Sequence, residues 1–132
     1  RNGIIEAVNG TLLRVRDGKK YIPSVAFEES LVDGLKKYLE CQKSIGIEPP
    51  LFVMLSFLGV RGYSMTVNYP QPYSYNEIDR DVLILIEVMI QSFEVDLFVA
   101  MKPIFDAVWN AAGFQGSLNY DEKSIWGKNR KY

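Results

Sequence analysis

Three acidic residues have the types and the spacing that a divalent cation would use. Asp79 and Asp81 are separated by one residue, and Glu87 follows within the next apolar run. Because alternate residues of a strand share a face, Asp79 and Asp81 would lie side by side if a strand already began there. Carboxylate oxygens are ligands that Mg²⁺ takes in proteins, so the three residues are candidate metal ligands. The alternative interpretation is a polar strand entrance with Arg80 nearby, since no nucleotide-binding motif accompanies the acids.

A second set of residues could bind nucleic acid. Cations and an aromatic ring are predicted to share one face of an N-terminal sheet, and such faces can bind single strands. The segment Gly59–Gly62 has the GxxG spacing that some RNA-binding modules use to clamp a nucleic-acid backbone between two helices. Because the sequence favours strands on both sides, an ordinary turn is the alternative for this segment, as a solvated charged face is for the sheet. The candidate nucleic-acid-binding residues are Arg14, Arg16, Lys19, Tyr21 and Arg61.

The chain contains no histidine and a single cysteine, Cys41. Imidazole is the usual general base near neutral pH and the commonest metal ligand, so Ser-His and Cys-His catalytic arrangements and histidine-rich zinc sites cannot form within this chain. The phosphate-binding lysine loop and the GxGxxG, GxSxG and HExxH motifs are also absent. The sequence therefore favours a non-catalytic chain, and we expect no catalytic residue and no cofactor.

Length and composition predict one globular domain. The 132 residues are 48% hydrophobic and 23% charged, and the formal net charge is -1. Such a chain can build a core without disulfides or metal, and it is not a globally basic nucleic-acid binder. One cysteine fits a reducing cytosol, and the apolar runs 51–60 and 82–90 are too short to span a bilayer, so we expect a cytoplasmic protein. The start at Arg1, inside an expected strand, predicts a piece excised from a longer protein.

Two tight-turn dipeptides near the N-terminus predict a three-stranded meander. Asn9-Gly10 and Asp17-Gly18 tolerate the positive φ angles of type I′ turns. They would join strands over 4–8, 11–16 and 19–22, with the register fixed by the two-residue turns. The apolar face of this meander would carry Ile4, Val8, Leu13, Val15 and Ile22.

Two helices are predicted from apolar residues at helical spacing. The first begins at Ser24, a plausible N-cap residue, continues to about residue 45 and stops at Gly46. The second opens at Ser92 or Glu94 and ends at Gly113. The predicted apolar stripes are Phe27, Leu31, Leu35, Tyr38 and Leu39 in the first helix, and Leu97, Met101, Phe105, Val108 and Ala112 in the second.

Two continuous apolar runs predict strands that are buried on both faces. Leu51 to Val60 and Val82 to Ile90 are these runs, and a buried helix starting at Pro50 is the rival interpretation of the first. A further strand is expected over 63–67. Residues 69–77 hold three tyrosines and two prolines, which predicts an exposed connector or an aromatic recognition loop.

Together these elements predict a two-layer α/β domain. A mixed sheet of five or six strands, beginning with the meander, would be covered by two helices on one face. We expect the domain to span residues 1–122 and residues 123–132 to form a basic, frayed tail. Near the C-terminus, Leu118, Tyr120 and Trp126 are expected to pack against the domain.

Four segments resemble a region of a family of bacterial proteins. They are Ile47–Pro50, Leu55–Tyr63, Asp79–Asp81 and Phe105–Gly113. Proteins of that family carry, upstream of this region, a Schlafen-type AlbA-like domain to which DNA binding or ATP binding is ascribed. The resemblance covers residues 1 to about 122, and it is to the poorly characterised downstream region. The named domain is absent from this chain, so the resemblance supplies no catalytic residue.

The leading functional expectation is a non-catalytic C-terminal accessory domain, for interaction or regulation, within a larger bacterial protein. Its partner would be another protein or the upstream domain of the same chain, and nucleic acid would be reached through the parent protein. The first alternative is a nucleic-acid-binding module that uses the basic sheet face and the GVRG turn. The second is an Mg²⁺-dependent enzyme that uses the three acidic residues. The sequence leaves the oligomeric state open.

Overall fold

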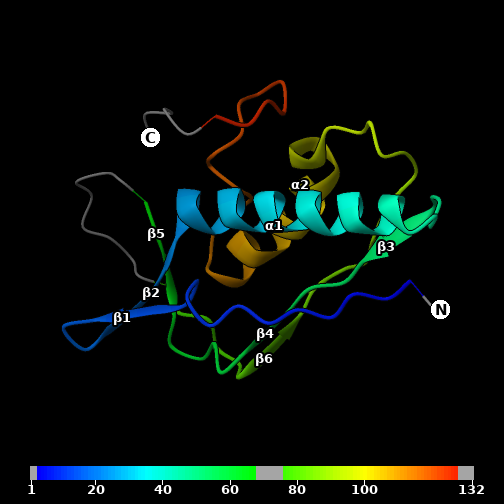
Figure 1. The fold of residues 1–132 in the computed structure, drawn as a ribbon. Helices are drawn as coiled ribbons and strands as arrows, with labels where there is room; N and C mark the ends of the chain where they lie inside the picture. Colours follow the sequence, from blue (N-terminus) through cyan, green and yellow to red (C-terminus); the bar gives the residue numbers. More distant parts are fainter. Residues whose placement is uncertain (1–2, 68–75, 128–132) are drawn as a thin grey trace.

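The computed structural model describes residues 3–67 and 76–127 (Figure 1). The described residues form two helices and seven short strands, so the chain is α/β as predicted. The strands belong to three small sheets rather than to one sheet of five or six strands. The strands are β1 (Arg14–Arg16), β2 (Lys19–Pro23), β3 (Leu51–Val53), β4 (Ser56–Leu58), β5 (Ser64–Thr66), β6 (Val82–Ile84) and β7 (Val88–Ile90), and the helices are α1 (Ser24–Ser44) and α2 (Leu97–Ala111).

The N-terminal sheet has the order β1-β2-β5 and is mixed. β1 and β2 are antiparallel, and their turn places Asp17 and Gly18 at φ 51° and 73°, as the predicted type I′ turn requires. β2 then pairs in parallel with β5, which confirms the strand expected over 63–67. In the antiparallel register Arg14 opposes Tyr21 and Arg16 opposes Lys19.

The first strand of the predicted meander is absent, because residues 4–8 form no strand. Gly10 lacks the positive φ that the predicted hairpin turn requires. Instead, the Asn9 side chain accepts hydrogen bonds from the backbone amide and the hydroxyl of Thr11, each at 2.8 Å. This local bond competes with hairpin formation. β1 is therefore an edge strand, and Val15, predicted to be apolar core, is 62% exposed.

The two long apolar runs pair with each other as an antiparallel ribbon, so the rival helical interpretation of the first run is wrong. β3 pairs with β7, and β4 pairs with β6. Leu51 opposes Ile90, whereas Leu58 opposes Val82, so the register changes by one residue between the two ladders. One strand therefore carries an extra residue at 86–87, which is the definition of a β-bulge.

Helix α1 begins directly after Pro23, whose extended backbone occupies the N-cap position without a side-chain hydrogen bond. Ser24, the predicted cap, is instead the first helical residue and is buried. Gly46 lies just beyond the end of α1 and has a φ of 84°, the left-handed conformation that commonly follows the C-terminus of a helix. Phe27 and Leu39 of the predicted stripe are buried.

Helix α2 begins a few residues later than predicted. The Asp96 carboxylate accepts hydrogen bonds from the amides of Phe98 and Val99 at 2.9 and 3.3 Å, so Asp96 is the N-cap. Neither Ser92 nor Glu94 has that role. The predicted apolar stripe is buried at four of its five positions, Met101, Phe105, Val108 and Ala112, and Leu97 is half-buried.

Three phenylalanine rings join the helices to the ribbon. The ring of Phe27 on α1 lies 5.6 Å from the ring of Phe57 on β4 and 5.6 Å from that of Phe105 on α2, centroid to centroid. Figure 1 shows α1 crossing in front of α2, with the ribbon below them. The core therefore sits between the two helices and one face of the ribbon.

The segment after α2 folds back over the helices. Tyr120 pairs with Trp126 as an isolated antiparallel bridge, and the Gly127 amide donates to the Asn119 carbonyl at 2.9 Å. Residues 123–127 thus belong to this C-terminal hairpin rather than to a frayed tail. Tyr120 and Trp126 pack as predicted, whereas Leu118 is 39% exposed.

Two expectations concern residues outside the described ranges. They are the tyrosine-containing loop, for which residues 68–75 are not described, and the last part of the basic tail, residues 128–132. Within the described part of the chain, neither helix is both long enough and apolar enough to cross a bilayer.

Candidate functional site

The antiparallel ribbon is apolar on both faces, but the domain covers only one of them. Along β6 and β7 the exposed and buried residues alternate, and the alternation is interrupted only at the bulge, where Ile86 and Glu87 are both exposed. The inward side chains of Phe57, Leu83 and Val88 are buried in the core. No layer formed by residues 3–67 or 76–127 covers the outward side chains of the same strands. The expectation that both runs are buried on both faces is therefore wrong.

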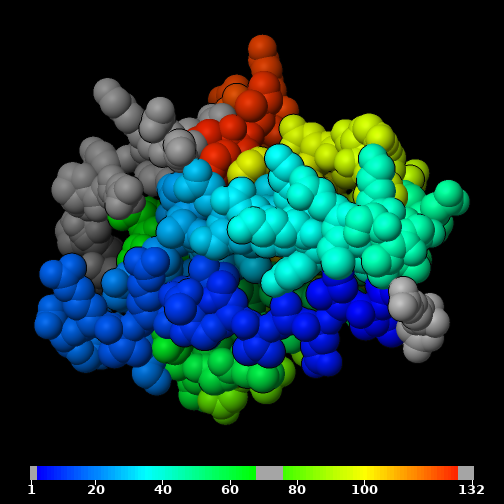
Figure 2. Space-filling model, viewed as in Figure 1, coloured from blue at the N-terminus to red at the C-terminus, as the bar shows by residue number. Residues whose placement is uncertain are grey.

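We call the outward apolar residues of the ribbon the ribbon face. Their exposed fractions range from 47% for Met89 to 77% for Ile84. Figure 2 shows the β4–β6 end of the ribbon, in green, at the lower edge of the molecule. Two cross-strand pairs, Phe52 with Met89 and Leu58 with Val82, tie the two strands of this face together. The ribbon face consists of Phe52, Met54, Leu58, Val82, Ile84, Ile86 and Met89.

The ribbon face is almost free of polar groups. The outward residues of the ribbon include one hydroxyl, on Ser56 opposite Ile84, and one carboxylate, on Glu87 at the bulge. Isolated exposed apolar residues are common on protein surfaces, but contiguous patches of this kind usually mark a binding surface. The arrangement can therefore bind an apolar surface.

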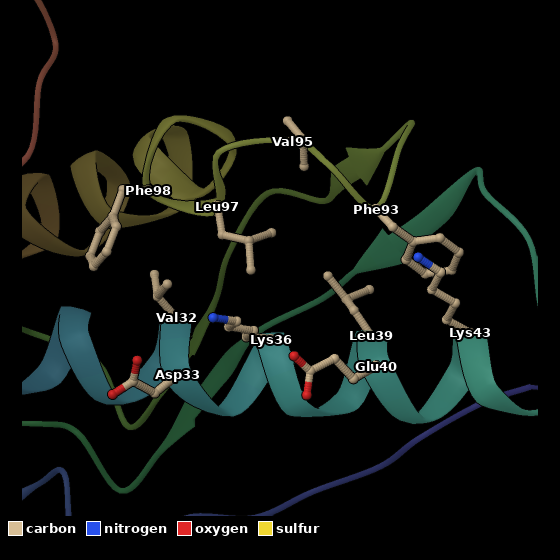
Figure 3. A pocket seen from close by; sticks show the side chains of 10 residues that line it. All are labelled: Val32, Asp33, Lys36, Leu39, Glu40, Lys43, Phe93, Val95, Leu97 and Phe98. Atoms are coloured by element: carbon tan, nitrogen blue, oxygen red, sulfur yellow. The ribbon is translucent and has the colours of Figure 1, made fainter.

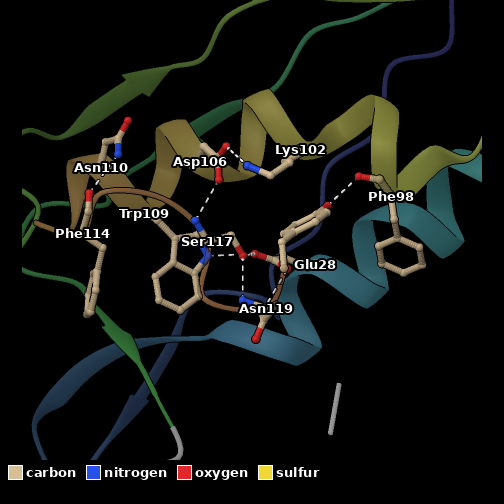
Figure 4. A network of polar contacts seen from close by, with 10 residues as sticks. Glu28, Phe98, Lys102, Asp106, Trp109, Asn110, Phe114, Ser117 and Asn119 are labelled. Carbon is tan, nitrogen blue, oxygen red and sulfur yellow. Dashed lines mark hydrogen bonds and ion pairs between the residues drawn. The ribbon is translucent and has the colours of Figure 1, made fainter. Parts of the chain in front are cut away.

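A second unusual feature is the carboxyl group of Glu28, which is completely buried between α1 and the C-terminal hairpin. It accepts hydrogen bonds from Trp109 Nε1 at 2.8 Å, Ser117 Oγ at 2.6 Å, Asn119 Nδ2 at 3.0 Å and Trp126 Nε1 at 2.6 Å. Figure 4 shows Trp109, Ser117 and Asn119 converging on this group. All four donors are uncharged.

These four hydrogen bonds define a structural role for Glu28. An ionised carboxylate is an acceptor with about four lone-pair sites, so four donors occupy its whole capacity. No lone pair is left to take a proton from a substrate. The bonds connect α1 to α2 and to both strands of the C-terminal hairpin, and we call this group of contacts the Glu28 clasp.

The sequence contains a signal for this burial that spacing alone could have shown. Glu28 follows Ser24 by four residues and precedes Val32 by four, and all three are buried on one face of α1. The helix dipole favours an acidic residue in the first turns of a helix at exposed positions too, so a place early in the helix does not by itself indicate burial. The partners of Glu28 lie more than 80 residues away, so no local pattern identifies them.

The hairpin is held further by contacts around Tyr120. Its hydroxyl donates to the Phe98 carbonyl at 2.6 Å, and the Trp126 ring stacks on the Phe98 ring at 4.1 Å. Burial raises the pKa of the Tyr120 phenol, and the negative charge of Glu28 adds to the increase. The phenol therefore remains a hydrogen-bond donor at all ordinary pH values.

A groove of about 450 Å³ lies between α1 and the segment that leads into α2 (Figure 3). Its interior is apolar and includes Val32, Leu39 and Leu97. Among the described residues no buried side-chain polar atom lacks a hydrogen-bond partner, so none marks a ligand position in the groove. The rim of the groove on α1 carries two acidic and two basic side chains, so it favours neither anionic nor cationic ligands. These residues are Asp33, Lys36, Glu40 and Lys43.

The three candidate metal ligands are not brought together. No group of three or more histidine, cysteine or acidic side chains that could hold a metal ion occurs in the described part of the chain. Asp81 accepts two hydrogen bonds from the Arg61 guanidinium, at 3.1 and 3.2 Å, and Asp79 accepts one from Arg80 Nε at 2.8 Å. Glu87 lies at the bulge of the ribbon, beyond β6.

The GVRG segment forms a turn, as the ordinary interpretation predicts, with Gly59 and Gly62 at positive φ. Besides its bonds to Asp81, Arg61 donates to the Asp79 carbonyl at 2.6 Å. The hydrogen bonds to Asp81 and the negative charge of Asp81 raise the pKa of the Arg61 guanidinium. Arg61 is thus engaged in fixing two loops to each other.

The four residues that were predicted to share one face of the N-terminal sheet do share it. The cross-strand pairs Arg14–Tyr21 and Arg16–Lys19 lie on one face of the β1–β2 hairpin, and the three cations are exposed. Arg61 does not join them. Its carbonyl accepts from Lys20, a residue whose side chain alternates to the opposite face of β2.

No protein-family model, curated protein or solved structure that was compared with this chain matches it. The functional inference therefore depends on the chain's own residues.

Proposed function

We propose that this chain is a non-catalytic interaction domain that binds another protein surface through the ribbon face. The observation that carries the proposal is the exposure of seven large apolar side chains on one continuous, nearly uncharged sheet face. Full burial of a large apolar side chain contributes up to about 3 kcal/mol at about 25 cal/mol per Å², which corresponds to about 120 Å² of apolar surface per side chain. Because the seven side chains are only partly exposed, together they present on the order of 500 Å² of apolar surface to solvent. Leaving that area in water is costly, and a partner surface removes the cost.

The other polar features of the domain support a structural rather than a chemical role. The carboxyl group of Glu28 has all its acceptor capacity occupied, and Asp81 is paired with Arg61. A general base needs a lone pair within reach of a substrate proton. An interaction domain needs only a rigid scaffold, which the Glu28 clasp and the phenylalanine core supply.

We propose further that the domain is an accessory region of a larger bacterial protein with a Schlafen-type AlbA-like domain upstream. This part of the proposal depends on the resemblance of four sequence segments, and the ribbon face is compatible with either an intramolecular or an intermolecular partner. The sequence encoded upstream of Arg1 tests it directly. An upstream AlbA-like domain is expected, and an unrelated upstream sequence would contradict this part.

Site-specific photo-crosslinking tests the interaction proposal. A photoreactive amino acid replaces Ile84, which is 77% exposed at the centre of the ribbon face, in the full protein within the cells that make it. The matched control places the same group at Val99, a 55% exposed apolar residue on α2. Because only the ribbon face is proposed to be covered, we expect a discrete protein adduct from position 84 and none from position 99. Equal or absent crosslinking at the two positions would contradict the proposal.

The exposed Arg14, Arg16 and Lys19 face carries a second candidate function, binding of single-stranded nucleic acid. Three cations and one tyrosine give a small site, since about three neutralised phosphates correspond to a salt slope of about -2. Titration of a labelled oligonucleotide at low ionic strength tests it. Binding that is weakened by Arg16→Ala would support this function, and the absence of binding at low salt would exclude it.

A further inference from the structure

We propose that the ribbon face binds the ribbon face of a second copy of this chain, which gives a dimer with twofold symmetry. The inference rests on the proposed function and names the partner. Its carrying observations are the extent of the ribbon face, its lack of charge and the antiparallel geometry of the two strands.

The extent of the ribbon face matches what one side of a stable dimer needs. A standard interface covers about 800 Å² on each partner, of which about 60% is apolar, so roughly 500 Å² of apolar surface is required. The seven residues of the ribbon face, exposed by 47% to 77%, present an area of this order. The ribbon face can therefore supply the apolar part of one interface without any other element.

The charge distribution distinguishes the ribbon face from the other surfaces of the domain. Its outward residues include one acid, Glu87 at the bulge, and no base. Two copies of such a face can meet without like-charge repulsion, whereas two copies of the basic face around Arg14 and Arg16 would repel each other. A partner selected by charge would require a charged face, and the ribbon face is not one. The low charge of the ribbon face therefore permits contact with a second copy.

The geometry of the strands permits the required symmetry. The strands β4 and β6 run in opposite directions. A twofold rotation can therefore place the ribbon of one copy on the ribbon of the second copy with their strands aligned. Two sheets that pack face to face with aligned strands lie about 10 Å apart and interdigitate their side chains. In the dimer each ribbon would then be covered by the domain's own core on one face and by the second copy on the other.

Sedimentation velocity of the purified chain tests the dimer. We expect the wild-type chain to have twice its 15.1 kDa mass at micromolar concentrations. Ile84→Lys places a charge at the centre of the proposed interface and is expected to sediment as a monomer with an unchanged circular dichroism spectrum. Val99→Lys introduces the same charge at an exposed site on α2 and is expected to remain a dimer.

Disulfide trapping gives a second readout that does not depend on tight association. In a Cys41→Ser background, Met54→Cys places a thiol near the middle of the ribbon face, and Val99→Cys places one outside it. Under mild oxidation, we expect at least a tenfold faster formation of the covalent dimer from the first variant than from the second.

The outcomes separate this inference from the proposed function. A wild-type monomer at high concentration, together with equal trapping rates for the two cysteine variants, would overturn the dimer. If position 84 nevertheless crosslinks to a different protein in cells, the interaction domain stands and the second copy does not. A monomer without crosslinks at position 84 would overturn both.

Discussion

At the residue scale, the decisive group is the buried carboxyl of Glu28. A buried charge without a cation is costly unless hydrogen bonds replace its hydration. Two indole N–H groups, one hydroxyl and one side-chain amide donate four such hydrogen bonds at 2.6 to 3.0 Å. Glu28 therefore stabilises the packing of the C-terminal hairpin, although its residue type would suggest a chemical role.

Replacing Glu28 by Gln should destabilise the domain by about 3 kcal/mol, since one acceptor oxygen becomes a donor group that faces other donors. The free energy of unfolding from urea titration measures the effect. Glu40→Gln on the exposed rim of the same helix is the matched control, and its effect should stay within about 0.5 kcal/mol. Similar losses for the two variants would contradict the role of the clasp.

Asp79 gives a pH prediction at the same scale. The hydrogen bond from Arg80, together with the charge of Arg80, lowers the pKa of the Asp79 carboxyl from its ordinary value of 3.8. Because the folded pKa is the lower one, this stabilisation is fully present above the unfolded pKa and is lost as the pH falls through the folded pKa. The pair is exposed, so the contribution to stability is small.

A carbon-13 NMR titration of the Asp79 carboxyl measures this shift. The midpoint in the wild-type chain should lie below 3.8, and Arg80→Ala should raise it. An identical midpoint in both chains would show that Arg80 does not hold the carboxylate.

At the element scale, the turn dipeptides and the lengths of the apolar runs predicted many of the strands and turns. Which strand faces other elements cover could not be predicted. Asp17-Gly18 forms the expected turn, whereas Asn9-Gly10 does not, because the Asn9 side chain bonds Thr11 instead. Both dipeptides have the same propensity, so the difference depends on context. Likewise, the two continuous apolar runs predicted strands, with a buried helix as the rival interpretation of the first, but only the tertiary arrangement determines whether both faces of a strand are covered.

The start of α2 supplies the prediction at this scale. Asp96→Ala removes the acceptor for two helix amides and should cost about 1 kcal/mol of stability. Asp96→Asn keeps a good N-cap residue and should retain most of that stability. Thermal unfolding of the two variants measures the difference, and equal stability would show that the cap contributes nothing.

At the scale of the whole molecule, the described residues form an apolar core and leave the apolar ribbon face exposed. The helices and the C-terminal hairpin use their side chains to close the core around Phe27, Phe57 and Phe105. The ribbon contributes to that core with one face and presents the other to solvent. The candidate metal ligands were predicted from residue type and strand spacing, and the structure engages Asp79 and Asp81 with arginines instead. The ribbon face could not be predicted, because its residues look like interior residues in the sequence.

The central claim is that the ribbon face is covered by a protein partner, and the oxidation of the four methionines tests it most directly. Met54 and Met89 lie on the ribbon face, and Met65 and Met101 are buried in the core as internal references. Peroxide is applied to the wild-type protein in fresh cell extract and to the purified Ile84→Lys chain, and mass spectrometry measures the four rates. We predict that Met54 and Met89 oxidise several-fold more slowly in the wild-type extract, while Met65 and Met101 remain slow in both samples. Equal, rapid oxidation of Met54 and Met89 in the two samples would contradict the account.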